Sequence, residues 1–160
     1  WKRILNFIPK RTLKGRKAHR GFIMAFEDCR RVLIDLIPEP KDVILTGHSL
    51  GGAISILGAE YFEARAITFA APKVFFNEKV NDKILYTGFR TIGDWIPHLP
   101  ISFFFFVWSR AKPDYWISTG KNMYVQRTFP WFSFMPYHRM GTYIEILMDK
   151  IDETCNPKTK

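Results

Sequence analysis

Apolar side chains between Arg20 and Ile37 recur with the spacing of an amphipathic helix. They fall close to every 3.6 residues, and the pattern stops at Pro38, a residue that cannot continue a helix. The apolar positions are Phe22, Ile23, Phe26, Val32, Leu33, Leu36 and Ile37. We therefore expect a helix over this segment with one face in the core.

A short apolar run follows this helix after a proline-rich break. Val43–Thr46 is almost wholly apolar, as in a buried parallel strand, and Gly47 ends it. From Leu50 onward, small residues alternate with larger aliphatic ones, a composition that suits a helix lying very close to a sheet. The pattern predicts a strand, a tight turn and a helix in succession.

The middle of the chain continues this alternation. Ala66–Phe69 and Tyr86–Ile92 have the composition of strands, and Asn77–Ile84 that of a short helix between them. Strands that alternate with helices indicate parallel βαβ units. The sequence predicts a single α/β domain over residues 1–160, with a mostly parallel sheet flanked by helices.

Residues 95–137 have no regular period. This segment is rich in proline and aromatic side chains, and a loop of such length in a compact domain usually carries function. Regular spacing returns between Tyr143 and Ile151, where we expect a last amphipathic helix.

The chain has an excess of positive charge. Its 24 Lys and Arg residues against 15 Asp and Glu give a formal charge of +9, which attracts anionic partners of any kind. Much of the excess lies in residues 10–17 and 158–160, and no nucleic-acid-reading motif surrounds either segment. The basic segments are interpreted either as solvated surface or as a contact with an anionic membrane, and no nucleic-acid partner is expected.

Cysteine usage and hydropathy bear on the compartment. Cys29 and Cys155 form neither a disulfide framework nor a metal-ligand spacing. The longest apolar run, Ile101–Trp108, is too short to span a bilayer, and the first residues lack the apolar core of a signal peptide. We expect a cytoplasmic or membrane-peripheral protein; secretion stays open because the sequence begins with Trp1 rather than Met.

The chemistry-bearing motif stands between the first predicted strand and the second predicted helix. Gly47–Gly51 matches the nucleophile-elbow pattern G-x-S-x-G. The turn holds the serine backbone in a strained conformation, so we expect side chains at both flanking glycine positions to clash. Ser49 would then project from the carboxyl edge of the sheet, where the Leu50 N–H and the helix N-terminus can stabilise an oxyanion.

A serine nucleophile needs a base, and the base needs an orienting carboxylate. In α/β-hydrolases the carboxylate follows the serine along the chain and the histidine follows the carboxylate. Asp94 comes directly after the predicted strand that ends at Ile92, at the edge where such sites assemble. His98 and His138 both follow Asp94, and this order alone leaves the choice between them open.

The string Thr46–Ala53 resembles the class 3 lipase family, which comprises fungal triacylglycerol lipases and phospholipase A1-like enzymes. Other segments resemble the family in the same order along nearly the whole chain, namely residues 19–22, 68–74, 94–100 and 137–138. The resemblance implies an α/β-hydrolase fold, hydrolysis of carboxylic esters of lipids, and no metal or cofactor.

The same resemblance assigns roles to individual residues. It implies that Asp94 is the triad carboxylate and His138 the base, whereas His98 occupies a position that is often noncatalytic. It makes His19 and His48 packing or supporting residues. The chain departs from the family after the base, because two residues separate His138 from the next glycine where the family commonly has one.

A second departure concerns the oxyanion hole. In the family, a Gly-Thr/Ser-rich strand end precedes an Asp-Trp pair and supplies another oxyanion donor. Trp1 corresponds to that tryptophan, so the residues that carry this donor are not in the sequence. We therefore expect a domain shortened at its N-terminus, in which Leu50 supplies one of two donors.

An aromatic stretch separates the predicted acid from the predicted base, and it includes Phe103, Phe104, Phe105 and Trp108. One interpretation packs these residues on the core. The other makes them an acyl-chain groove or interfacial patch.

The predicted reaction is acyl transfer from a lipid ester to water. His138 takes the proton of Ser49, Leu50 N–H helps to hold the oxyanion, and Asp94 steadies the imidazolium. The alternatives are a thioesterase or small-ester esterase, and a catalytically inactive lipid-binding module. The sequence does not predict an oligomeric state.

Overall fold

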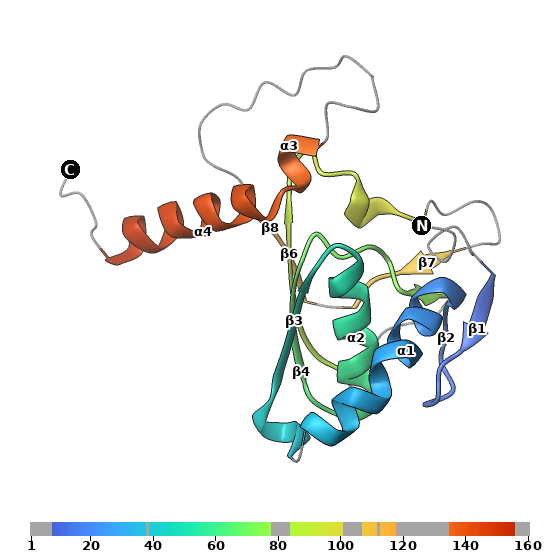
Figure 1. The fold of residues 1–160 in the computed structure, drawn as a ribbon. Helices are drawn as coiled ribbons and strands as arrows, with labels where there is room; N and C mark the ends of the chain where they lie inside the picture. Colours follow the sequence, from blue (N-terminus) through green and yellow to red (C-terminus); the bar gives the residue numbers. More distant parts are fainter. Residues whose placement is uncertain are drawn as a thin grey trace.

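A four-stranded parallel sheet forms the centre of the molecule (Figure 1). The computed structural model describes residues 8–37, 39–77, 84–100, 107–111, 113–117 and 135–155. The strand order is β3 (Ile44–His48), β4 (Arg65–Phe69), β6 (Leu85–Thr91) and β8 (Asp114–Ile117). Each strand pairs in parallel with the next, so the carboxyl ends of all four lie along one edge.

Two helices cover one face of this sheet. Helix α2 (Leu50–Phe62) packs directly on β3 and β4, and α1 (Arg20–Leu36) packs on α2. Close approach requires small residues on α2: a Cβ atom at Gly58 would lie 2.8 Å from Leu45 Cδ1. The shared core is apolar, with Phe22, Phe26, Ala53, Ile56, Leu57, Ala66 and Tyr86 among its buried members.

A second, antiparallel sheet lies beside the helices. Its order is β1 (Pro9–Arg11), β2 (Lys17–His19), β5 (Phe75–Phe76) and β7 (Trp108–Ser109). No part of this sheet was predicted from the sequence, because strands of two or three residues are too short to display a period of two.

The last helix projects away from the body of the molecule (Figure 1). Helix α4 (Met140–Cys155) buries Tyr143 and Ile146, whereas Ile144, Met148 and Ile151 are exposed. The predicted helix is therefore present, but only part of its apolar face contacts the sheet. Among the described residues, no helix combines the length and apolarity that crossing a bilayer requires.

The α/β class and most of the predicted elements are confirmed. The predicted helix 20–37 and the predicted strands match α1, β3, β4 and β6 to within a few residues. The prediction that residues 95–137 contain no regular structure is wrong, because β7 and β8 both lie in this segment. The predicted short helix Asn77–Ile84 lies almost wholly outside the described residues.

Candidate active site

Ser49 occupies the turn between β3 and α2 with a backbone conformation that few residues adopt. Its φ is 55° and its ψ is −123°, and it is the N-cap of α2. The turn is held on both sides: Ser49 N donates to the Phe69 carbonyl at 3.0 Å, and Ala53 N donates to the Ser49 carbonyl at 3.2 Å. The surrounding structure thus maintains the strain that a nucleophile elbow requires.

The two glycines that flank this serine differ in their surroundings. A Cβ atom at Gly47 would overlap the backbone of Gly51, whereas a Cβ at Gly51 would meet no described atom within 4 Å. The expectation that both positions exclude side chains is therefore wrong for Gly51, which points outward from the first turn of the helix. Gly52 is the second crowded position, where a Cβ would lie 2.8 Å from Ala71 Cβ.

We expect Gly47→Ala and Gly51→Ala to have opposite effects on stability. Overpacking at Gly47 should lower the free energy of unfolding by about 1–3 kcal/mol or more. Alanine at Gly51 should raise it by up to about 1 kcal/mol, because glycine disfavours a helix. Thermal or urea unfolding of the two variants measures both effects, and equal destabilisation would contradict the described turn.

The predicted acid, base and nucleophile meet at the carboxyl edge of the parallel sheet. His138 Nε2 lies 2.9 Å from Ser49 Oγ, and His138 Nδ1 lies 3.0 Å from Asp94 Oδ2 and 3.1 Å from Oδ1. These distances fit a tautomer in which Nδ1–H donates to the carboxylate and Nε2 accepts from the serine hydroxyl. Asp94 is buried, and the His138 side chain is 14% exposed.

Different elements supply the three residues. Ser49 follows β3, and Asp94 follows β6 after the turn at Gly93. His138 ends the one-turn helix α3 (Met135–His138), and α4 begins two residues later. The base therefore stands at the junction between these two helices.

The buried carboxylate of Asp94 has two further hydrogen bonds. Ile96 N donates to Oδ1 at 3.0 Å, and the Tyr143 hydroxyl donates to Oδ2 at 2.8 Å. The Tyr143 oxygen in turn accepts from Thr91 N at 3.1 Å. Burial and the negative charge of Asp94 raise the pKa of Tyr143 well above its ordinary value, so its hydroxyl stays protonated and remains a donor.

Tyr143 is the supporting residue that sequence reasoning missed. We had interpreted it only as an apolar position of the last helix. The available signal was a polar tip in the first turn of the last helix, five residues after the predicted base.

The remaining histidines occupy the surroundings of the three central residues. The His48 ring lies 4.6 Å from the His138 ring. The pKa of His48 is lowered first by burial and then by the charge of His138. His98 is exposed on the short 3-10 helix Ile96–His98, with its ring 5.9 Å from that of Trp116. His19 is buried as the N-cap of α1, where Nδ1 accepts from Gly21 N.

The predicted oxyanion donor lies at the first position of α2. Because Leu50 begins the helix, its N–H has no intrahelical carbonyl partner. In the described residues, no group of three or more His, Cys, Asp or Glu side chains could hold a metal ion.

The predicted lipid-binding residues are only partly described. Phe103, Phe104 and Phe105 lie outside the described residues. Trp108 is 6% exposed and packs against Phe76 and His19, a position that matches the packing interpretation rather than an open groove.

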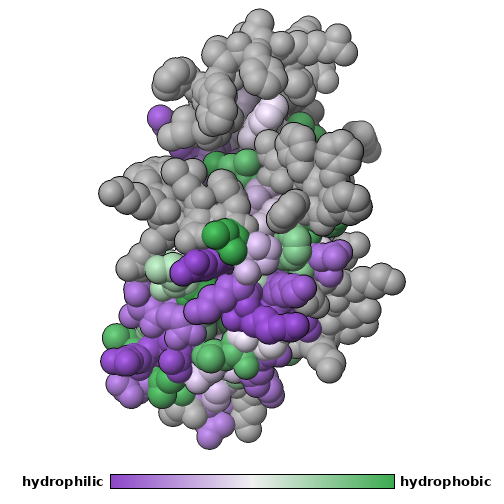
Figure 2. All heavy atoms as spheres, turned by 90° about the vertical axis from the view of Figure 1, so that its right-hand side faces the viewer, coloured by the Kyte–Doolittle hydropathy of each residue, from purple (hydrophilic) through white to green (hydrophobic). Residues whose placement is uncertain are grey.

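The basic segment 10–17 forms the β1–β2 hairpin and is largely on the surface. Lys14 bonds Glu63 at 2.7 Å, and Arg16 lies 3.2 Å from Glu60, so part of its charge is neutralised within the fold. Figure 2 faces this side of the molecule and shows mostly hydrophilic side chains with isolated hydrophobic ones.

Comparison with known proteins gives concordant relationships. The chain is 30% identical over 149 residues to a lipase of Rhizomucor miehei, an overlap covering 79% of this chain and 40% of that protein. It is 29% identical over 121 residues to a protein of Fusarium solani named secreted mono- and diacylglycerol lipase 1, covering 66% and 36% of the two chains. The chain thus spans well under half the length of these curated relatives.

Solved structures agree with the sequence relatives. The crystal structure of a mono- and diacylglycerol lipase from Aspergillus oryzae superposes with a TM-score of 0.60 at 27% identity, covering 73% of this chain and 49% of that one. The family described as Lipase (class 3) matches residues 3–104, a range that includes the elbow and Asp94. The chain therefore belongs to the class 3 lipase family.

Proposed function

We propose that this chain is the catalytic part of a serine hydrolase that cleaves carboxylic esters of lipids, built as one α/β-hydrolase domain. The observation that carries the proposal is the continuous path from Asp94 through His138 to Ser49, with heavy-atom distances of 3.0 and 2.9 Å. Such a path converts a weakly nucleophilic hydroxyl into an activated one. The strained elbow at Ser49 supports the same assignment.

The proposed reaction proceeds in two acyl transfers. His138 Nε2 accepts the Ser49 proton as Oγ bonds to the ester carbonyl carbon, and the imidazolium then protonates the leaving alcohol oxygen as its bond to that carbon breaks. Water next attacks the acyl-enzyme, again giving its proton to His138, and the serine hydroxyl is restored as the carboxylic acid departs. Throughout, Asp94 stabilises the charged imidazolium.

The negative charge that develops on the carbonyl oxygen needs preorganised donors. The Leu50 N–H and the positive end of α2 are the groups in this chain that we propose for this role. One such donor is typically worth about 10²–10³ in turnover.

We propose acylglycerols as the first substrates to test, because two of the matched proteins are named as mono- and diacylglycerol lipases. Phospholipids hydrolysed at the first acyl position are the second choice, as the resemblance of the sequence motifs suggests. One of these relatives is named as secreted, which favours the secreted alternative over the cytoplasmic one for this chain.

A substrate panel tests this function. Purified protein is incubated with monoacylglycerol, diacylglycerol, triacylglycerol and phospholipid dispersions and with short acyl esters and thioesters, and released acid is titrated. The expected result is acid release from a long-chain lipid ester that Ser49→Ala abolishes. Cleavage confined to thioesters or short esters would favour the esterase alternative, and lipid binding without any cleavage would identify an inactive binding module.

Tyr143→Phe is expected to lower kcat by about tenfold with little change in KM. A hydrogen bond to a charged group is worth roughly 1.5–3 kcal/mol, and this bond holds the carboxylate that orients His138. Thermal unfolding run beside the kinetics separates lost stability from lost orientation. Tyr115→Phe, at an exposed tyrosine of β8, is the matched control and should leave both parameters unchanged. A change confined to KM would contradict the orienting role.

A further inference from the structure

A cluster of cationic side chains lies at the β6–β8 edge of the sheet, outside the path that joins Asp94 to Ser49. Arg90 Nε and Arg110 Nη1 approach the same oxygen, Asp114 Oδ2, at 3.2 and 3.3 Å. Lys73 follows β4 and is tied to the loop after Asp94, because its N–H donates to the Leu99 carbonyl at 2.6 Å. One carboxylate oxygen therefore serves two guanidinium groups, and the charge of Lys73 is close enough to that of Arg110 for the two to interact.

The cluster contains more positive charge than its carboxylate can neutralise. Burial lowers the pKa of Lys73, and the charge of Arg110 lowers it further. The pKa of Arg110 is lowered in the same way, first by burial and then by the charge of Arg90. These two effects outweigh the attraction of Asp114, which raises the pKa. The Nε of Arg90 is buried and makes no hydrogen bond of good geometry with a described residue. The three cations and the single carboxylate leave about two positive charges without a counterion.

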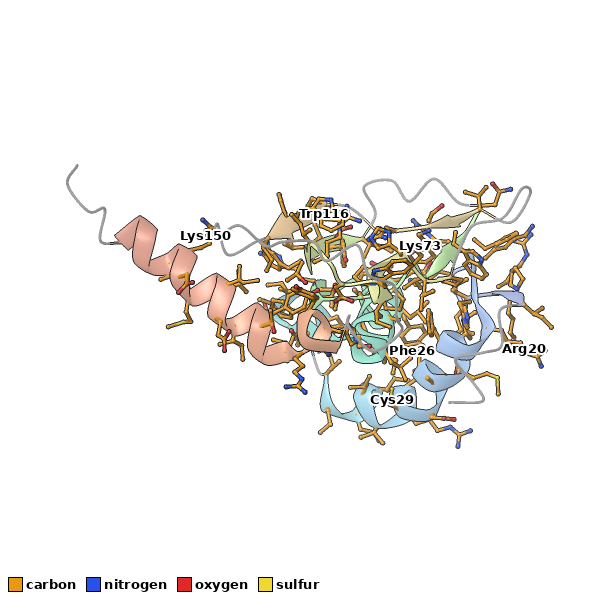
Figure 3. All side chains as sticks on the ribbon, turned by 90° about the horizontal axis from the view of Figure 1, so that it is seen from above. Arg20, Phe26, Cys29, Lys73, Trp116 and Lys150 are labelled. Carbon is orange, nitrogen blue, oxygen red and sulfur yellow. The ribbon has the colours of Figure 1, made fainter. Side chains whose placement is uncertain are left out.

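The rim of the cluster is open to solvent, whereas the Arg90 and Arg110 side chains themselves are 17% and 16% exposed. Trp116 is 49% exposed, and the guanidinium carbon of Arg90 lies 3.9 Å from the centre of its ring. His98 lies beside this ring and is partly exposed. The part of its side chain that is buried lowers its pKa, and the charges of Arg110, Arg90 and Lys73 lower it further. Figure 3 shows Lys73 and Trp116 on the same side of the molecule, away from Cys29 of α1.

The other carboxylate that acts on this region is Asp94, whose charge reaches His98. Its oxygens already accept from Ile96 N and Tyr143 and face His138. Asp94 is therefore engaged elsewhere, and among the described residues Asp114 is the carboxylate that pairs with the cluster.

We propose that Lys73, Arg90 and Arg110, with His98 and Trp116 at the rim, form a binding site for a phosphate group. A phosphate carries up to two negative charges, which match the charge excess, and its oxygens suit the planar fork of a guanidinium group. The same chemistry is present in inorganic phosphate and in an anionic phospholipid head group. This site does not depend on the hydrolytic function, because no member of it contacts Ser49 or His138.

Calorimetric titration at constant ionic strength tests the site. Ser49→Ala protein is titrated with inorganic phosphate and, separately, with dihexanoyl phosphatidic acid below its critical micelle concentration. Both titrations are repeated after Arg110→Gln and after Lys73→Gln. Lys10→Gln, at an exposed position of β1, is the control that removes equal charge elsewhere.

We expect saturable binding of at least one of these two probes. Each cluster variant should weaken that binding about tenfold or more, because each removes a hydrogen bond to a charged group. Lys10→Gln should leave the binding unchanged. Binding of phosphate alone assigns the site to a soluble anion, and binding of the lipid assigns it to a head group. Thermal unfolding in chloride checks the fold, and Arg110→Gln should melt near the parent temperature because the cluster is overcharged. The proposal would be overturned if neither probe bound saturably, or if both cluster variants bound the probe as strongly as the parent protein.

Discussion

Replacing His138 with alanine is expected to lower the turnover of a lipid ester by about 10⁴–10⁶-fold. His138 is the group that joins Ser49 to Asp94, and removal of the base leaves the hydroxyl in its weakly nucleophilic form. Residues of such a relay act as a unit, so Ser49→Ala combined with His138→Ala should be scarcely slower than either variant alone. Steady-state kinetics on the best substrate of the panel measure all three proteins.

His98→Ala provides the matched control for this result. His98 lies on the loop after Asp94 but faces Trp116, so its removal should change turnover only modestly. A loss at His98 as large as the loss at His138 would contradict the assignment of the base. Multiplicative losses in the double variant would show that Ser49 and His138 act independently.

Asp94→Asn is expected to lower turnover by about 10⁴-fold. The carboxylate fixes the His138 tautomer that accepts the serine proton, and an amide in its place can donate to Nδ1 and favour the wrong tautomer. The substitution also disturbs the buried hydrogen bonds from Ile96 N and Tyr143, so the free energy of unfolding should fall by about 1–3 kcal/mol.

Kinetics and urea unfolding, measured on the same preparations, separate these two effects. Asp35→Asn, at an exposed position of α1, is the control for loss of one carboxylate and should change neither quantity. Turnover close to that of the parent protein, in a folded Asp94→Asn variant, would contradict the orienting role of Asp94.

Local sequence patterns were sufficient where a short segment determines its own structure. The elbow at Ser49 follows from the glycine positions and from the change of period between β3 and α2. The period of 3.6 residues likewise predicted α1, although its buried residues lie between Gly21 and Phe26 and the apolar side chains of Val32 and Leu36 are exposed. These features depend on neighbours close in sequence, and the structure reproduces them.

Features that depend on distant partners were not predictable in this way. β8 pairs with β6 through only four residues, and it lies in an aromatic segment whose composition masks any alternation. Asp114 resembles an ordinary turn residue until Arg90, from a distant part of the chain, is placed beside it. The contact of Tyr143 with Asp94 spans 49 positions and leaves no local signature.

The candidate site shows the same division. Ser49 could be identified from its own motif, whereas Asp94 and His138 required the chain order of a known family. The structure brings these three side chains within hydrogen-bonding distance although 89 positions separate His138 from Ser49.

The most direct test of the account is the site at which a fluorophosphonate probe labels the protein. The probe phosphorylates an activated serine, and peptide mass spectrometry locates the adduct. The account predicts an adduct on Ser49 that is lost in Ser49→Ala and strongly reduced in His138→Ala. Ser55, by contrast, is buried and donates to the Gly51 carbonyl. An adduct on another serine, or no adduct in the folded protein, would contradict the central claim that Ser49 is an activated nucleophile.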